Sequence, residues 1–406
     1  MKQQRSAARL AKGDSAKDAP AGTLSAGDCA CAEAEALRGG LGPEPTEEDE
    51  RAFAAITATA LTDEERERIA RPAVVLPRQE RVLAVHWHPE FVPMELIRRR
   101  IEATFPGCAQ GLFIPTQHNQ ILSYDAYCGV EVDCYSSGFN QKVQLLVHFR
   151  ADRQDKAGVL ASMLAHTARY RSSQLFEFLD VLAGRDEERL NRVAAETGAA
   201  EETIRFARIH ARKLSALLER HAGDVPLETL KNKLVRGFLD AQRPRFGDRL
   251  VTRVQSFAQA VKLRVKAQFP MQYFYRASEV IEEARGFGAG VVIPHPEQFW
   301  PILLADYDVD GYEVWNPQSQ RYTEFLIDTL ARKNRKGWTD RRQLVFMGDD
   351  THMSEKIRNP DQASDKVLRE IGVQSAWDDI GIRKRLLASG MDRACVINEY
   401  TARLDG

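Results

Sequence analysis

The chain has 406 residues, which corresponds to two or three domains at about 150 residues each. Its 57 lysines and arginines balance 58 aspartates and glutamates, which excludes binding of nucleic acid through an overall positive charge. No apolar run approaches the roughly 18 residues of a membrane-spanning helix, and the first 20 residues lack the apolar core of a secretory signal. Six cysteines are too few for a disulfide scaffold, so we expect a cytoplasmic protein.

Residues 1–75 differ from the rest of the chain in composition. Residues 1–50 are rich in Ala, Gly, Ser and Glu, and their acidic side chains outnumber the basic ones. Because such a segment buries too little apolar surface to offset its ordering entropy, we expect residues 1–75 to be largely disordered. A short amphipathic helix is expected within 51–75. Cys29 and Cys31 form a CxC pair here, and two thiols alone do not complete a structural zinc site.

Short apolar runs rich in β-branched residues begin at residue 81. They lie at 81–88, 111–118, 129–135, 143–149, 289–295, 311–315 and 344–350. Segments with helical spacing of apolar residues lie between several of them, at 94–105, 299–305 and 322–331. Near-continuous apolar runs are typical of buried parallel strands, and their alternation with helices predicts an α/β fold.

Residues 151–286 interrupt this alternation. They contain long segments with helical spacing and no run typical of a strand, which predicts a mainly helical insertion in a domain made of 76–150 and 287–406. Within the insertion, residues 231–270 hold ten lysines and arginines against two aspartates, a local net charge of +8. This stretch is either a solvated helix face or a surface that receives phosphates.

Six of the nine histidines lie at or just past the ends of the predicted strands, together with the carboxylates of Glu131, Glu313, Asp349 and Asp350. In a parallel α/β barrel the carboxyl ends of the strands converge on one rim, so these side chains are expected to meet there. Imidazoles and carboxylates gathered in this way indicate a metal site. The six histidines are His86, His88, His118, His148, His295 and His352.

The spacing of these residues supports the same interpretation. Alternate residues of a strand point to one face, so His86 and His88 can reach one ion, and Asp350 and His352 repeat this spacing. Asp349 can serve as a ligand or stabilise a turn. Glu313 can bind a metal directly, support another ligand or contact the substrate.

The order of these motifs resembles the PHP family of metal-dependent phosphoesterases over roughly residues 80–150 and 287–355. Each motif is short, and the resemblance depends on all of them occurring in the order of the family. In this chain the matching segments are His86-Trp87-His88, Thr116-Gln117-His118-Asn119, Gly129-Val130-Glu131, 143–148, Ile293-Pro294-His295-Pro296, Gly311-Tyr312-Glu313-Val314 and 348–352.

The resemblance implies a distorted, TIM-like barrel of seven βα units that binds two or three divalent ions, with manganese, iron and zinc as the usual metals. It implies that one ion is held by His86, His88, Glu131 and Asp350. Glu131 would bridge to a second ion, and the remaining positions would be filled by His118, His148, His295 and His352. A metal-activated water would then hydrolyse a phosphomonoester or nucleotide, with His352 or Asp349 assisting the leaving group.

Two departures from the family pattern bear on function. The aspartate of an S-D-G segment, which the family carries after its HxH motif, is missing at 89–93, where Glu90 is the available substitute. Gln117 replaces the aspartate of T-D-H-N, and an amide cannot act as a base. Three hypotheses follow: a phosphoesterase for small phosphorylated substrates, a nuclease or phosphodiesterase that binds nucleic acid through the basic insertion, and a non-catalytic metal-binding protein.

Overall fold

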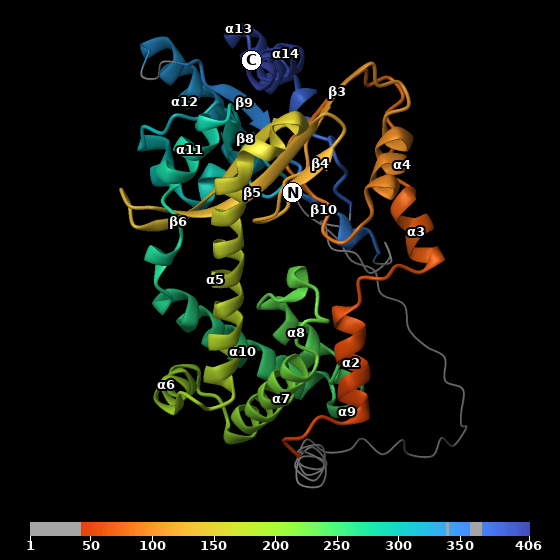
Figure 1. Cartoon of the computed structure of the whole chain (residues 1–406), viewed down its shortest axis with the longest axis vertical. Coiled ribbons are helices and arrows are strands. Elements are labelled where there is room, and N and C mark those ends of the chain that lie inside the picture. Colours follow the sequence, from red (N-terminus) through yellow and green to blue (C-terminus); the bar gives the residue numbers. More distant parts are fainter. Residues whose placement is uncertain (1–41, 338–340, 358–367) are drawn as a thin grey trace, which may run out of the picture.

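The computed structural model describes residues 42–337, 341–357 and 368–406 (Figure 1). The expectations for residues 1–41, including the disordered tail and the Cys29–Cys31 pair, lie outside these residues. The described chain folds into a mixed α/β body from which a helical body extends. The α/β prediction is therefore confirmed at the level of fold class.

Strands build the first of these bodies. In chain order they are β1 (Arg81–Ala84), β2 (Trp87–His88), β3 (Gln110–Phe113), β4 (Leu122–Tyr124), β5 (Tyr127–Ser136), β6 (Gln141–Arg150), β7 (Gly290–Ile293), β8 (Gly311–Trp315), β9 (Leu344–Met347) and β10 (Thr351–His352). One sheet has the order β4-β5-β6-β7-β8-β9, and two further pairs are β1-β3 and β10-β2.

The predicted closed barrel of parallel strands is not what the described residues form. Strands β7, β8 and β9 are parallel, but β5 and β6 make an antiparallel hairpin, and β6 also runs antiparallel to β7. The three sheets remain separate. Both hairpin strands are buried on both faces, so their apolar runs look like those of parallel strands.

The three sheets meet through a few short contacts. Strand β10 pairs with β2, so that His352 lies opposite His88. The amide of Asp350 donates to the carbonyl of His86 at 3.1 Å. An isolated parallel bridge joins His118, after β3, to a residue of β5. Segments that are far apart in the sequence therefore lie side by side where the sheets meet.

Helices surround the sheets and form the second body. Those before, between and after the strands are α2 (Glu47–Thr57), α3 (Asp63–Ala70), α4 (Met94–Thr104), α11 (Ala277–Gly286), α12 (Thr323–Lys336), α13 (Ile380–Ser389) and α14 (Arg393–Asp405). Those of the insertion are α5 (Gly158–Leu182), α6 (Glu187–Thr197), α7 (Glu201–Arg220), α8 (Lys233–Asp240), α9 (Arg243–Phe246) and α10 (Asp248–Gln268). None of the helices in the described part of the chain combines the length and apolarity needed to cross a membrane.

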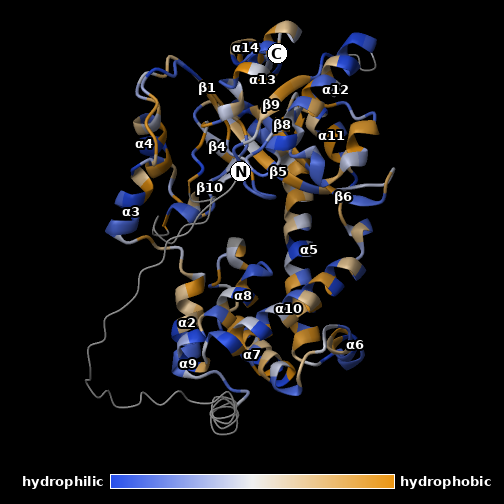
Figure 2. Ribbon diagram, turned by 180° about the vertical axis from the view of Figure 1, so that it is seen from behind, coloured by the Kyte–Doolittle hydropathy of each residue, from blue (hydrophilic) through white to orange (hydrophobic). Residues whose placement is uncertain are grey.

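Helix α5 connects the two bodies. Its first half packs Leu160 and Leu164 into the core of the main sheet, whereas Leu175 and Phe178 belong to the separate core of the helical body. Figure 1 shows this helix running from the sheet to the helices below it. Figure 2 shows the same division in hydropathy, with apolar strands in one body and helices of mixed character in the other.

Helices α2 and α3 lie in the described part of residues 1–75, where one short amphipathic helix was expected within 51–75. Each helix begins with a capping box, in which Thr46 pairs with Asp49 and Thr62 pairs with Glu65. Phe53 of α2 is buried in the core of the helical body. Capping and burial together offset the ordering entropy that composition alone suggested would dominate.

A buried ion pair fixes α2 to the helical body. The Nζ atom of Lys213 in α7 lies 2.7 Å from Oδ2 of Asp49, and each side chain is about 1% exposed. The other oxygen of Asp49 accepts a hydrogen bond from Gln242 at 3.3 Å. Burial alone would raise the pKa of Asp49, but the hydrogen bonds from Lys213 and Thr46 lower it.

We predict that Lys213→Met lowers the free energy of unfolding by about 3–5 kcal/mol, because it leaves the Asp49 carboxylate buried without its cation. The control is Arg220→Met, which removes an exposed ion pair with Glu50 between the same two helices and should cost less than about 1 kcal/mol. Urea unfolding of both variants measures the difference. Equal effects would show that α2 is not held by the buried pair.

Candidate metal centre

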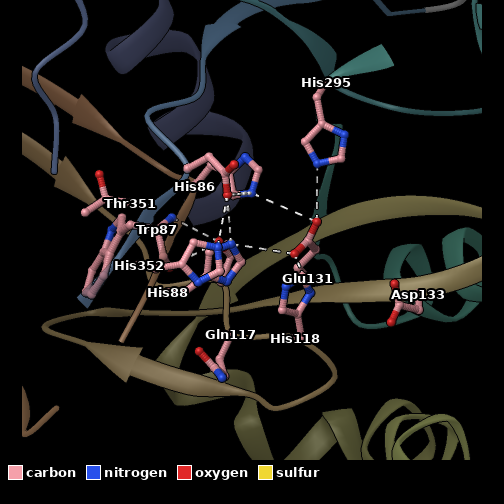
Figure 3. A network of polar contacts seen from close by, with 12 residues as sticks. His86, Trp87, His88, Gln117, His118, Glu131, Asp133, His295, Thr351 and His352 are labelled. Atoms are coloured by element: carbon pink, nitrogen blue, oxygen red, sulfur yellow. Dashed lines mark hydrogen bonds and ion pairs between the residues drawn. The ribbon is translucent and has the colours of Figure 1, made fainter. Parts of the chain in front are cut away.

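The carboxylate of Glu131, in the middle of β5, lies among four imidazoles (Figure 3). Its Oε1 atom is 4.0 Å from Nε2 of His86 and 3.5 Å from Nε2 of His295. Its Oε2 atom is 3.7 Å from Nε2 of His88 and 2.6 Å from Nδ1 of His118. The two oxygens of one buried carboxylate thus face two different pairs of histidines.

The carboxylate of Asp350 forms a second centre of contacts. Its Oδ1 atom lies 3.8 Å from Nε2 of His86, 3.4 Å from Nε2 of His88 and 3.5 Å from Nε2 of His352. Its Oδ2 atom accepts from Nη1 of Arg369 at 3.2 Å. Arg369 therefore holds one oxygen while the other faces the imidazoles.

Seven of the predicted ligands come together in this way. They form three overlapping groups, within each of which the potential ligand atoms lie within 4.8 Å of one another. The ring of His88 is stacked with that of His118 and with that of His352, at centroid distances of 4.6 and 4.3 Å. The three groups are His86–His88–Asp350, His86–Glu131–His295 and His88–His118–His352.

The donor set fits divalent metal ions. Buried ring nitrogens of His86 and His88 have no hydrogen-bond partner among the described residues. Buried polar atoms are normally satisfied, and an unsatisfied cluster of this kind calls for an explanation such as an ion. Imidazole nitrogen with carboxylate oxygen is a donor set that suits zinc, iron and manganese.

The backbone is strained where three side chains enter the site. Glu90, His295 and Asp350 have φ angles of 52°, 30° and 48°, in the left-handed region that non-glycine residues rarely occupy. Strain of this kind persists only where the surrounding structure imposes it, and it concentrates at functional sites. At His295 and Asp350 the turn follows the end of a strand and directs the side chain toward Glu131 and its neighbours.

Glu313, at the middle of β8, positions two of the histidines. Its Oε1 atom lies 2.5 Å from Nδ1 of His86, and its Oε2 atom accepts from the backbone amide of His295 at 3.0 Å. Burial would lower the pKa of His86, but Glu313 above all raises it to about 10. A Cβ atom at Gly348 would collide with the Glu313 carboxylate, which explains the glycine. These contacts favour a supporting role for Glu313 over direct ligation.

Glu90 and Gln117 occupy the position where the sequence departs from the PHP pattern. The side-chain carbonyl of Gln117 accepts from the amide of Glu90 at 3.0 Å, a contact that needs no charge. The Glu90 carboxylate lies 3.3 Å from Nδ1 of His352 and accepts from the amide of Ser354. Glu90 therefore contacts the centre through His352 and is outside the three ligand groups.

His148 does not join the other histidines. Because β6 runs antiparallel to β7, His148 lies opposite Gly290 at the start of β7, whereas His295 follows the end of that strand. Its Nδ1 atom is 2.8 Å from the hydroxyl of Tyr400 in α14. Burial lowers the pKa of His148 to about 3, so its ring is neutral. His148 is therefore outside the three ligand groups, because the antiparallel direction of β6 carries it toward the start of β7.

Asp349 is likewise directed away from the centre. Its carboxylate accepts from the amides of Thr351 and Gly372 and from the side chain of Gln374. The left-handed backbone at Asp350 turns its carboxylate toward the histidines, while that of Asp349 stays with these donors. Burial raises the pKa of Asp349 to about 6. Its contacts stabilise the turn that carries Asp350, and the expected catalytic role is not supported.

Two further residues shape the site. Asp133 follows Glu131 by two positions in β5, and exchanges two hydrogen bonds with Asn119, which fixes the loop that carries His118. The alternation of Glu131 and Asp133 was a sequence signal for this role. Arg369 had none, because it lies beyond the last recognisable motif.

Comparison with known proteins gives little beyond this geometry. No protein-family model and no curated protein matches the chain. One similar solved structure is that of a "putative metal-dependent phosphoesterase" from Bifidobacterium adolescentis, with 17% identity and a TM-score of 0.37. The match covers 78% of this chain and 99% of the other. Its family therefore stays a proposal that depends on this chain's own residues.

We predict that Glu313→Gln weakens metal binding by about 10–100-fold while the protein stays folded, because loss of a group that orients a ligand typically has this effect. Isothermal titration of the metal-free chain with Zn²⁺ or Mn²⁺ measures it. The control is Glu324→Gln, an exposed side chain of α12 paired with Arg385. Unchanged affinity in Glu313→Gln would contradict the positioning role.

We also predict that His295→Gln lowers the number of bound metal ions per chain, whereas His148→Gln does not, because only His295 faces Glu131. Elemental analysis of the purified variants gives the number of ions. Thermal unfolding of both variants separates a loss of metal from a loss of fold. Metal loss in His148→Gln without unfolding would show that this residue is a ligand after all.

Proposed function

We propose that this chain is a metal-dependent hydrolase that cleaves a phosphoester of a small phosphorylated substrate. The observation that carries the proposal is the convergence of seven imidazole and carboxylate side chains from five separate segments of the chain. Their order along the sequence is also that of the PHP phosphoesterases.

The residues suit at least two ions. His86, His88 and Asp350 would hold one, with the Glu131 carboxylate placed to bridge toward a second. The remaining donors are His118, His295 and His352. Bound divalent ions would lower the pKa of a water molecule and neutralise charge on the phosphoryl oxygens.

The chain's own groups supply orientation and a proton path. Glu313 holds the His86 ring so that Nε2 points into the centre, and Arg369 holds Asp350. His352 is about a quarter exposed, and its Nδ1 atom lies against Glu90 while its Nε2 atom faces Asp350. This leaves two roles for His352: a metal ligand through Nε2, or a proton donor to the leaving group at the mouth of the site.

The structure offers less support for the nuclease hypothesis. Several arginines of the basic stretch 231–270 form ion pairs with acidic side chains instead of a continuous cationic track. These pairs are Arg236–Asp240, Arg243–Asp240, Arg245–Glu48, Arg253–Glu202 and Arg264–Glu196. The hypothesis of a non-catalytic protein was motivated by the missing S-D-G aspartate, and three candidate ligand groups form without that residue.

We predict that the purified chain hydrolyses p-nitrophenyl phosphate when Mn²⁺ is present and that EDTA abolishes this activity reversibly. Asp350→Asn should lower the rate by more than the roughly 100-fold expected for a residue that only supports a ligand, because Asp350 faces three histidines. Steady-state kinetics with each metal measures both effects.

The matched control is Asp349→Asn, an adjacent carboxylate that points away from the ligands. The Asp349→Asn change should reduce the stability of the protein to a greater extent than it reduces the activity of each folded molecule. Activity that persists in EDTA, or an Asp350→Asn variant as active as the wild type, would contradict a metal-dependent hydrolase. Full metal loading without hydrolysis of any phosphoester tested would favour a non-catalytic protein.

A further inference from the structure

The helical insertion forms a cationic pocket together with the β5–β6 hairpin. The pocket has a volume of about 380 Å³, within the usual range for small-molecule sites. Phe269 and Phe274 contribute an apolar part of its wall. Its positively charged lining consists of Lys142, Arg171, Lys231, Lys233 and Lys266.

One wall of the pocket is tied to the strand that carries Glu131. Lys142 Nζ and Arg171 Nη1 lie 2.6 and 2.5 Å from the two oxygens of Asp133. Asp133 is completely buried and follows Glu131 by two residues, so both carboxylates lie on one face of β5. The pocket and the metal centre therefore share a strand.

The opposite wall reaches the other side of the centre. Lys233 lies 3.4 Å from Glu355, three residues after His352. Next to Glu355, the backbone amide of Ser354 donates a hydrogen bond to the Glu90 carboxylate at 3.0 Å. Glu90 in turn contacts His352 at the mouth of the site. The contacts with Asp133 on one wall and with Glu355 on the other therefore place the pocket beside the metal centre.

The pocket carries more positive than negative charge. No aspartate or glutamate is among the residues that line it in the described part of the chain. Lys142 and Arg171 share the carboxylate of Asp133, and Lys233 contacts Glu355. Burial lowers the pKa of Lys266, and the neighbouring cations Lys142, Lys262 and Arg171 lower it further. An anion in the pocket would relieve this repulsion.

We propose that this pocket binds a second phosphate group of the substrate, so that the substrate is a small molecule with two phosphates, one of which is held at the metal centre. This inference rests on the proposed function. Lysine ammonium groups bind phosphate as point charges, and the phenyl groups of the wall lower the local dielectric, which strengthens the attraction. Lys231 and Lys266 line the pocket from the loop before α8 and from α10, and they are the residues we expect to contact the phosphate.

A small molecule suits the pocket better than a nucleic acid. The lysines surround a single pocket. Arginines farther along the same stretch, such as Arg253 and Arg264, are paired with glutamates. A nucleic-acid backbone would instead need a row of cations that follows successive phosphates.

The direct test is calorimetric titration of the full, EDTA-treated chain with inorganic pyrophosphate, which isolates the pocket from any bound metal. We expect the double variant Lys231→Gln, Lys266→Gln to bind at least about tenfold more weakly than the wild type, which by the free-energy relation is about 1.4 kcal/mol. The control Lys262→Gln removes the same charge one turn earlier in α10 and does not line the pocket. It should bind within about twofold of the wild type.

Kinetics with Mn²⁺ gives the second readout. The double variant should raise KM for a sugar bisphosphate about tenfold and leave kcat/KM for p-nitrophenyl phosphate unchanged, because the latter has no second phosphate. The proposal is overturned if the double variant binds pyrophosphate as tightly as the wild type does. It is also overturned if Lys262→Gln loses as much pyrophosphate affinity as the double variant. A third outcome also overturns it: a single-stranded thymidine oligonucleotide displaces pyrophosphate, and its binding weakens steeply as the salt concentration rises. The ligand of the pocket would then be nucleic acid.

The two proposals fail in different ways. Lysine-dependent pyrophosphate binding without hydrolysis of any phosphoester would support the pocket and contradict the phosphoesterase. Metal-dependent hydrolysis of p-nitrophenyl phosphate with no effect of the two lysines on any ligand would support the phosphoesterase and overturn the pocket.

Discussion

The buried carboxylate of Glu131 is the group on which the arrangement of the centre depends. A carboxylate removed from water costs several kcal/mol unless it is paired, so the fold must surround it with compensating groups. Burial would raise the pKa of Glu131, but the histidines around it, led by His118, hold it well below its usual range. The strand ends and loops that carry these histidines are therefore held together at the place where three sheets meet.

Much of this centre could be predicted from the sequence because strand periodicity is two. His86 and His88, and again Asp350 and His352, face one side at that spacing, and the structure pairs the two segments side by side. The direction of a strand has no such signature. Since both faces of the β5–β6 hairpin are buried, its composition resembles that of parallel strands, and His148 was placed at the wrong end of the sheet.

The remaining differences also have physical causes. Helices α2 and α3 begin with capping boxes, which are visible in the sequence as Thr46 with Asp49 and Thr62 with Glu65. The prediction of disorder depended on the average composition of the segment, which does not register such local signals. The left-handed backbone at Asp350 decides which of two adjacent aspartates faces the ligands, and no residue pattern announces it. Contacts made across the fold, such as that of Arg369, depend on packing that local patterns do not encode.

The helical insertion and the metal centre are coupled through Asp133. This carboxylate is completely buried beside Glu131, and one of its two cations, Arg171, comes from α5 of the insertion. Without Arg171, only Lys142 would compensate the buried carboxylate of Asp133, which would destabilise the strand that carries Glu131. Arg171 therefore stabilises the centre, and it cannot at the same time give its full charge to a bound anion. Lys231 and Lys266, which also line the pocket, are the cations on which substrate recognition should depend.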